Sequence, residues 1–205
     1  MGCVVRDNPG RACTPGTKRG YYASALNPEI SNNERPDLCE ACGGACCRTH
    51  PGVEAPARFL AASDPPASLS SALASREWVL AEHVGVPWVD GVPPPDEDRY
   101  RVLRYPRPAT VAELAAGRPG AGAADDCVFL APGGCRLPFA DRPRMCRSLE
   151  PSSDGDCVAA WDRRAAALAW LPHQGLVTAA LALLVRYEGA GAPPARPAET
   201  ERFPR

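Results

Sequence analysis

Four cysteines occur within nine residues, in the run Cys39-Glu-Ala-Cys42-Gly-Gly-Ala-Cys46-Cys47. No other feature of the chain restricts its fold as strongly. A Cys-x2-Cys turn lets two thiolates converge on one metal ion, and the two glycines permit the tight backbone that such a loop needs. A disulfide between the adjacent Cys46 and Cys47 would be strained. The run therefore predicts a loop that binds metal.

A second group of cysteines lies far along the chain: Cys127, Cys135, Cys146 and Cys157. Four thiolates complete either a structural zinc site or a 4Fe-4S cluster. The eight cysteines of the two groups could make two closed sites, or one site with spare thiols. Their spacing does not choose between these arrangements, nor between zinc and iron. The other two, Cys3 and Cys13, are expected to lie in a mobile tail whose role the sequence does not indicate.

Ten cysteines in one chain raise the question of its redox compartment. Residues 1–22 hold no apolar stretch like the core of a secretory signal, which favours a cytoplasmic protein. Thiols stay reduced in the cytosol, so metal ligation is the better explanation of the cysteines. An exported, disulfide-bonded protein stays open as an alternative. The longest apolar run, 175–185, suits a buried helix and is too short to span a bilayer, so we expect no membrane association.

The charge and composition argue against a nucleic-acid partner. The formal net charge is −1, whereas proteins that follow phosphates carry a clear positive excess. Of the 23 basic residues only Lys18 is a lysine, and with the abundant Ala, Pro and Gly this bias is typical of a GC-rich bacterial genome.

The distribution of Pro and Gly predicts one domain with two tails. We expect an irregular N-terminal tail over 1–38, a metal-binding domain over 39–188 and a disordered tail over 189–205. The predicted fold is a small, mainly α domain with a small β-hairpin and long loops, organised around the cysteine-metal cluster.

Local patterns place the elements of this domain. Apolar spacing predicts helices over 55–62 and 69–83, and alternation predicts a short strand near 100–105. Thr110 and Glu113 have the spacing of a capping box, which begins a helix that runs to Ala116. A tight connection joins two extended pieces within 127–139, and Pro143 suits the first turn of a following helix. After Asp156 two helices are expected as an antiparallel pair, with Pro172 between them and Trp161 and Trp170 in the core.

The cysteines and their neighbours together resemble the YkgJ-type cysteine-cluster family. The resemblance rests on Cys39, Cys42, Cys46 and Cys47, on Cys127-Val-Phe-Leu130, on Cys135 and on Arg142-Pro143-Arg-Met-Cys146-Arg147. It implies a zinc- or iron-chelating domain. One branch of the family is similar to flagellin lysine methylases, so an iron-sulfur-dependent S-adenosylmethionine methyltransferase acting on protein or peptide lysine is an alternative. The chain departs from the family in having Leu137-Pro138-Phe139 where Ile-Tyr is usual, and Cys157 has no counterpart.

Two arginines beside the cysteines are candidates for a supporting role. Arg142 and Arg147 flank Cys146, and guanidinium groups near thiolates would lower thiol pKa values and offset the charge of a metal centre. The alternative is that both form surface ion pairs. His50 is either a further ligand or a group near the site. The glycines of 117–122 indicate a loop and not a cofactor-binding motif, and no catalytic residue, protein partner or oligomeric state can be inferred.

Overall fold

The computed structural model describes residues 43–49, 51–89, 91–120, 125–150, 157–159 and 161–189. Both predicted tails lie outside these residues almost entirely. So do Cys3, Cys13, Cys39, Cys42 and His50, and what was predicted for them stays a prediction.

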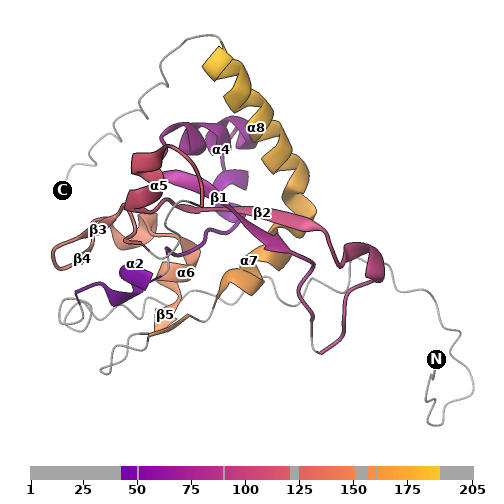
Figure 1. The fold of residues 1–205 in the computed structure, drawn as a ribbon, viewed down its shortest axis with the longest axis horizontal. Helices are drawn as coiled ribbons and strands as arrows, with labels where there is room; N and C mark the ends of the chain where they lie inside the picture. Colours follow the sequence, from indigo (N-terminus) through magenta and orange to yellow (C-terminus); the bar gives the residue numbers. More distant parts are fainter. Residues whose placement is uncertain are drawn as a thin grey trace, which may run out of the picture.

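An antiparallel hairpin of two seven-residue strands forms the centre of the described structure (Figure 1). Strand β1 (Trp78–Val84) pairs with β2 (Val102–Pro108), in a register that runs from Trp78 opposite Pro108 to Val84 opposite Val102. Leu103 and Tyr105 of β2 are buried as alternate residues, and Pro106 to Pro108 at its end are buried without alternation. The predicted strand near 100–105 is confirmed, and it extends further than the sequence indicated.

The helix predicted over 69–83 is wrong in its second half. Helix α4 (Pro65–Ala74) begins at the N-cap Asp64, whose carboxylate accepts from Ala67 N, and it ends where Arg76 adopts a left-handed conformation at φ 62°. Apolar residues at 69, 73 and 80 mimic helical spacing across this break. The stretch after it is rich in aromatic and β-branched residues and forms β1 instead.

The helices cover both sides of the hairpin. Figure 1 shows α4 and α8 (Gln174–Gly189) above it and α7 (Arg163–Trp170) below it, and α8 packs against both α4 and β2. Phe59, Trp78, Phe129 and Trp170 join in the core through ring contacts at centroid distances of 6.1 to 6.5 Å. Trp161 and Trp170 are both buried, which confirms the prediction for these two residues.

The expected antiparallel pairing of the last two helices is also wrong. The two helices exist, but a 3-10 turn, η4 (Leu171–His173), joins α7 to α8 and the helical backbone runs on from Arg163 to Arg186. Pro172 stands in the first turn of η4, where its missing N–H breaks no helical hydrogen bond. By length and composition alone this segment could also cross a membrane. It contributes Trp170, Val177 and Ala180 to the core, as a helix of a globular protein does.

The remaining elements are short: α2 (Ala45–Thr49), α3 (Ala57–Leu60), η2 (Asp96–Asp98), α5 (Val111–Ala116), β3 (Leu130–Ala131), β4 (Gly134–Cys135), η3 (Phe139–Asp141), α6 (Arg144–Arg147), β5 (Leu149–Glu150) and β6 (Val158–Ala159). The capping box of α5 is confirmed, because Thr110 Oγ1 accepts from Glu113 N and Glu113 Oε2 accepts from Thr110 N. The small hairpin of β3 and β4 is confirmed as well. The predicted helix after Pro143 is the single turn α6, and that over 55–62 is the four-residue α3. The described fold thus mixes helices with three two-stranded antiparallel sheets, where a mainly helical fold with one small hairpin was expected.

Candidate metal centre

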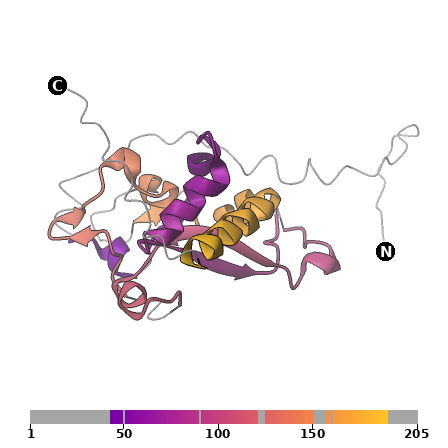
Figure 2. The same ribbon diagram turned by 90° about the horizontal axis from the view of Figure 1, so that it is seen from above.

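Six cysteines line one cavity of about 340 Å³: Cys46, Cys47, Cys127, Cys135, Cys146 and Cys157. All six are free thiols. They come from α2, from the chain on either side of the β3–β4 hairpin turn, from α6 and from the residue before β6. Figures 1 and 2 both place α2, the β3–β4 hairpin and α6 together on one side of the β1–β2 hairpin. Every cysteine that the sequence analysis proposed as a ligand, and that the structure describes, therefore reaches this cavity.

A backbone hydrogen bond joins the two cysteine groups directly, because Cys127 N donates to Cys47 O at 2.8 Å. Within the first group, Cys47 N donates to Gly44 O at 2.8 Å and closes the turn that begins α2. Gly44 has a φ of 78° and lies against Leu130 of the β3–β4 hairpin, where a Cβ atom would overlap the leucine side chain. Glycine is therefore favoured at this position by its positive φ, and a side chain there would also displace the end of Leu130.

The thiol of Cys47 is the centre of a hydrogen-bonded group of four cysteines. It interacts with the thiols of Cys127, Cys135 and Cys46, which, together with burial, raises the pKa of Cys47. The hydrogen bond from Cys47 lowers the pKa of Cys46 to about 7 and that of Cys135 to about 6, against burial, which raises both. The same contact lowers the pKa of Cys127. The three neighbours of Cys47 thus ionise more readily than an isolated cysteine, and Cys47 less readily.

Cys146 and Cys157 complete the lining of the cavity. Burial raises the pKa of Cys146, and so do the nearby thiols of Cys46 and Cys127 and the carboxylate of Glu54. Without a cation in the cavity, Cys146 therefore stays protonated at neutral pH. The other residues that line the cavity are mostly apolar, among them Phe129, Met145 and Leu149.

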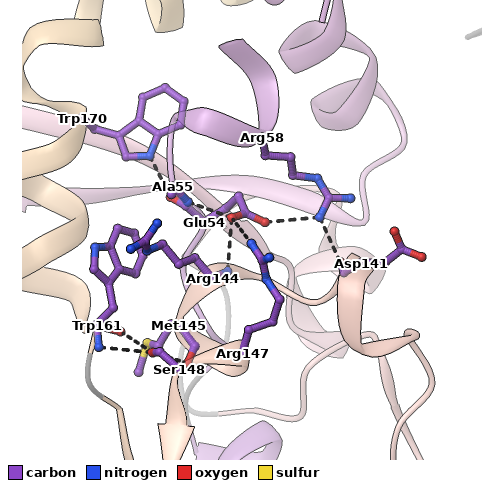
Figure 3. A network of polar contacts seen from close by, with 10 residues as sticks. All are labelled: Glu54, Ala55, Arg58, Asp141, Arg144, Met145, Arg147, Ser148, Trp161 and Trp170. Carbon is purple, nitrogen blue, oxygen red and sulfur yellow. Dashed lines mark hydrogen bonds and ion pairs between the residues drawn. The ribbon is translucent and has the colours of Figure 1, made fainter. Parts of the chain in front are cut away.

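Glu54 organises the polar network beside Cys146, drawn in Figure 3. Its side chain is fully buried, and Oε1 accepts from Ala55 N at 2.8 Å and from Arg144 N at 3.1 Å. Oε2 accepts from Arg58 Nη1 at 3.2 Å, and Arg147 Nη2 lies 3.9 Å from Oε1. Burial raises the pKa of Glu54, while these hydrogen bonds and the nearby arginines oppose that effect. The sequence carried no signal for this residue, because its hydrogen-bond partner on α6, Arg144, lies 90 residues away.

The two arginines proposed to support the site make different contacts. Arg142 donates from Nε to Leu137 O at 3.0 Å and lies over the ring of Phe139, and its charge helps to lower the pKa of Cys135. Arg147 faces Glu54. Arg136, which the sequence analysis did not single out, also lowers the pKa of Cys135. It follows Cys135 directly, so adjacency was the available signal.

The chemistry of these residues suits a metal ion, but their present positions suit it less well. Thiolates bind zinc, copper(I) and iron-sulfur clusters, and the thiols are already gathered. However, in the part of the chain that the structure describes, no group of three or more His, Cys, Asp or Glu side chains has the geometry to hold a metal ion. Ligation would therefore require the thiols to lose their protons and to change their positions.

Comparisons with protein-family models, with curated proteins and with solved structures found no match for this chain. The fold and the site define a small protein of mixed helices and antiparallel sheets that carries a cysteine-lined cavity. Membership of the YkgJ-type family stays a prediction from the motif.

Proposed function

We propose that this protein binds a thiolate-ligated metal centre, either zinc or an iron-sulfur cluster, in the cysteine cavity. The observation that carries the proposal is the convergence of six free thiols from distant parts of the chain on one cavity. Cys39 and Cys42, which precede α2 in the sequence, are proposed as further ligands from the same loop. We also propose a cytoplasmic location, because the site needs reduced thiols.

A structural role for the cysteines alone explains the cavity poorly. Buried cysteines usually behave as small apolar residues that fill space in a core. Here six sulfurs border one cavity of about 340 Å³ instead of packing only against apolar side chains. A ligand bound to the sulfurs would occupy this space.

The number of thiols favours more than a single zinc ion. A structural zinc site uses four thiolates at about 2.3 Å from the ion. The described cavity has six thiols and is far larger than the space enclosed by four sulfurs at that distance. A cluster of several metal ions, or one tetrathiolate centre beside accessible cysteines, agrees with both the number and the volume.

The charges next to the cavity support an anionic occupant. Arg58 and Arg147 face the buried carboxylate of Glu54, which also accepts from the backbone N of Arg144, and the guanidinium of Arg144 lies over the ring of Trp161. Arg144 is buried and shares α6 with Cys146. A centre ligated by four or more thiolates is negative, and nearby guanidinium groups would stabilise it.

The first test is to purify the protein without oxygen, record its visible spectrum and measure iron, zinc and sulfide. Iron with sulfide and a broad absorption band at about 400 nm would identify an iron-sulfur centre, and would justify assays for S-adenosylmethionine binding and lysine methylation. Zinc without visible absorption would identify a zinc-thiolate site. Protein that carries no metal, and takes up neither zinc nor ferrous iron with sulfide, would refute the proposal. Disulfides in that protein would then favour the exported alternative.

A further inference from the structure

We propose that Gly52 positions Cys146 in the cysteine cavity, because the missing side chain of Gly52 leaves the space that the Cys146 sulfur occupies. Gly52 itself lines the cavity and is buried. A Cβ atom at this position would overlap Cys146 Sγ, at a separation no van der Waals contact allows, and would lie 3.3 Å from Cys146 N. The importance of the contact rests on the proposed metal-binding function, but its geometry does not.

Backbone conformation does not explain the glycine. Gly44 and Gly85 also lack room for a side chain, yet both have positive φ angles that favour glycine in any case. Gly52 is not among the residues with positive φ. An L-residue could adopt its backbone conformation, so the space taken by Cys146 is the observed reason for glycine here.

The segment that contains Gly52 cannot withdraw to make room. On one side it holds α6, because Met145 N donates to Val53 O at 3.1 Å and Arg144 N donates to Glu54 Oε1 at 3.1 Å. On the other side Glu54 N donates to Pro106 O of β2 at 3.0 Å, and Trp170 Nε1 donates to Glu54 O at 2.8 Å. These bonds fix the distance between Gly52 and α6 from both sides.

An added methyl group at position 52 would therefore displace the Cys146 side chain. Cysteine has three staggered χ1 positions, and the one observed places the sulfur on the cavity wall against Gly52. Rotation of the Cys146 side chain to another χ1 position would relieve the overlap. The Cys146 sulfur would then leave its present place among the six cysteines of the cavity. The other five cysteines make no close contact with the Gly52 Cβ position, so they keep their places. Gly52 thus decides whether Cys146 can serve as a ligand.

A double-mutant cycle tests this inference with two readouts, metal content and thermal stability. The variants are Gly52→Ala, Cys146→Ala and the two combined, with Gly175→Ala as the matched control. Gly175 has no neighbouring atom within 4 Å of an added Cβ, so alanine there meets open space. Each protein is studied free of metal and after anaerobic addition of zinc, or of ferrous iron with sulfide.

Gly52→Ala should lower the melting temperature of the metal-free protein by about 2 to 12 °C, as overpacking of a core does in a chain of this size. In the Cys146→Ala background the same substitution should cause a much smaller drop, since the overlapping sulfur is gone and only the 3.3 Å contact with the backbone N of residue 146 remains tight. Metal bound per chain should fall equally in Gly52→Ala, in Cys146→Ala and in the double variant. Gly175→Ala should retain the metal content of the unsubstituted protein.

Additive effects overturn the inference. If Gly52→Ala destabilises the Cys146→Ala protein as much as the original, or if the double variant fails to fold, Gly52 is needed for another reason. Unchanged melting and metal content in Gly52→Ala would also refute it. If the unsubstituted protein binds no metal, the proposed function fails, while the cycle in metal-free protein still decides whether Gly52 positions Cys146.

Discussion

Glu54→Gln should be strongly destabilising. Glu54 is a fully buried carboxylate whose oxygens only accept hydrogen bonds, whereas the amide group of glutamine also donates. Glutamine has the same shape, and its oxygen could keep the bonds from Ala55 N and Arg144 N. Its amide group would then take the place of Oε2 and face the guanidinium of Arg58, which donates to Oε2 at 3.2 Å. Two donors would then face each other, and the network would lose the negative charge of Glu54.

Removing one partner of a buried ion pair costs about 3 to 5 kcal/mol, because the remaining charge stays desolvated. Arg58 is partly exposed, with 37% of its side chain accessible, whereas Glu54 is at 0%. Solvent can therefore reach Arg58, and it also reaches Arg147, whose side chain is 27% exposed, which favours the lower end of that range. A loss of about 3 kcal/mol corresponds to about 6 to 12 °C in melting temperature for a chain of this size.

The assay is equilibrium unfolding by urea at neutral pH, with circular dichroism as the signal. Glu82→Gln is the matched control, since Glu82 pairs with Arg104 at 2.9 Å but has 55% of its side chain exposed. An exposed pair contributes about 0 to 1 kcal/mol. Equal losses in the two variants would contradict the central role given to the Glu54 network.

Two further predictions concern the cavity and helix α5. Cys46→Ser should reduce the metal bound per chain, measured by elemental analysis, whereas Cys3→Ser should not; unchanged metal in Cys46→Ser would refute the cavity as the site. Burial alone would raise the pKa of Glu113, but hydrogen bonds from Arg107, Thr110 and Gly120 lower it from 4.5 to about 2. The ionised form therefore stabilises the fold above about pH 4.5, by about 3 kcal/mol, and this contribution disappears as pH falls toward 2. The difference in unfolding free energy between Glu113→Gln and the unsubstituted protein should shrink over that range, and a difference independent of pH would show that ionisation is not its cause.

A structural feature is easier to predict from the sequence when the residues that interact in it lie close together along the chain. Thr110 and Glu113 cap a helix across three residues, so one short window contains the whole interaction. The strand β1 was missed because Leu69, Leu73 and Leu80 fit a helical period, although Arg76 breaks the helix between them. The sequence contains the same residues, but tertiary pairing with β2 decides their conformation.

The residues of the candidate site also differ in how readily the sequence indicates them. Cysteine spacing singled out the residues of the cavity, because ligands of one centre recur in short, dense motifs. The sequence pattern did not single out Glu54 or Gly52, since an isolated Glu or Gly occurs for many structural reasons. Only the fold brings Glu54 to α6 and Gly52 to Cys146.

The arrangement of the core changes what metal removal is expected to do. The sequence suggested that metal would hold together an otherwise loop-rich fold. In the structure the ring contacts of Phe59, Trp78 and Trp170 lie between α3, β1 and α7, and none of these three residues lines the cysteine cavity. Most of the buried apolar residues around the hairpin and its helices thus lie outside the cavity wall, and Cys47, Cys127 and Phe129 connect the two regions.

Chelation of the metal should therefore loosen the cavity while the hairpin stays folded. Hydrogen exchange can resolve the two regions, because the Cys47 and Cys127 amides are bonded within the cavity wall and the β1–β2 amides are bonded within the hairpin. We expect the first set to lose protection on chelation and the second to keep it. Loss of protection in both sets at once would mean that metal and core fold as one unit, as the sequence had suggested. Unchanged protection in both would mean that the thiols hold the cavity wall without metal.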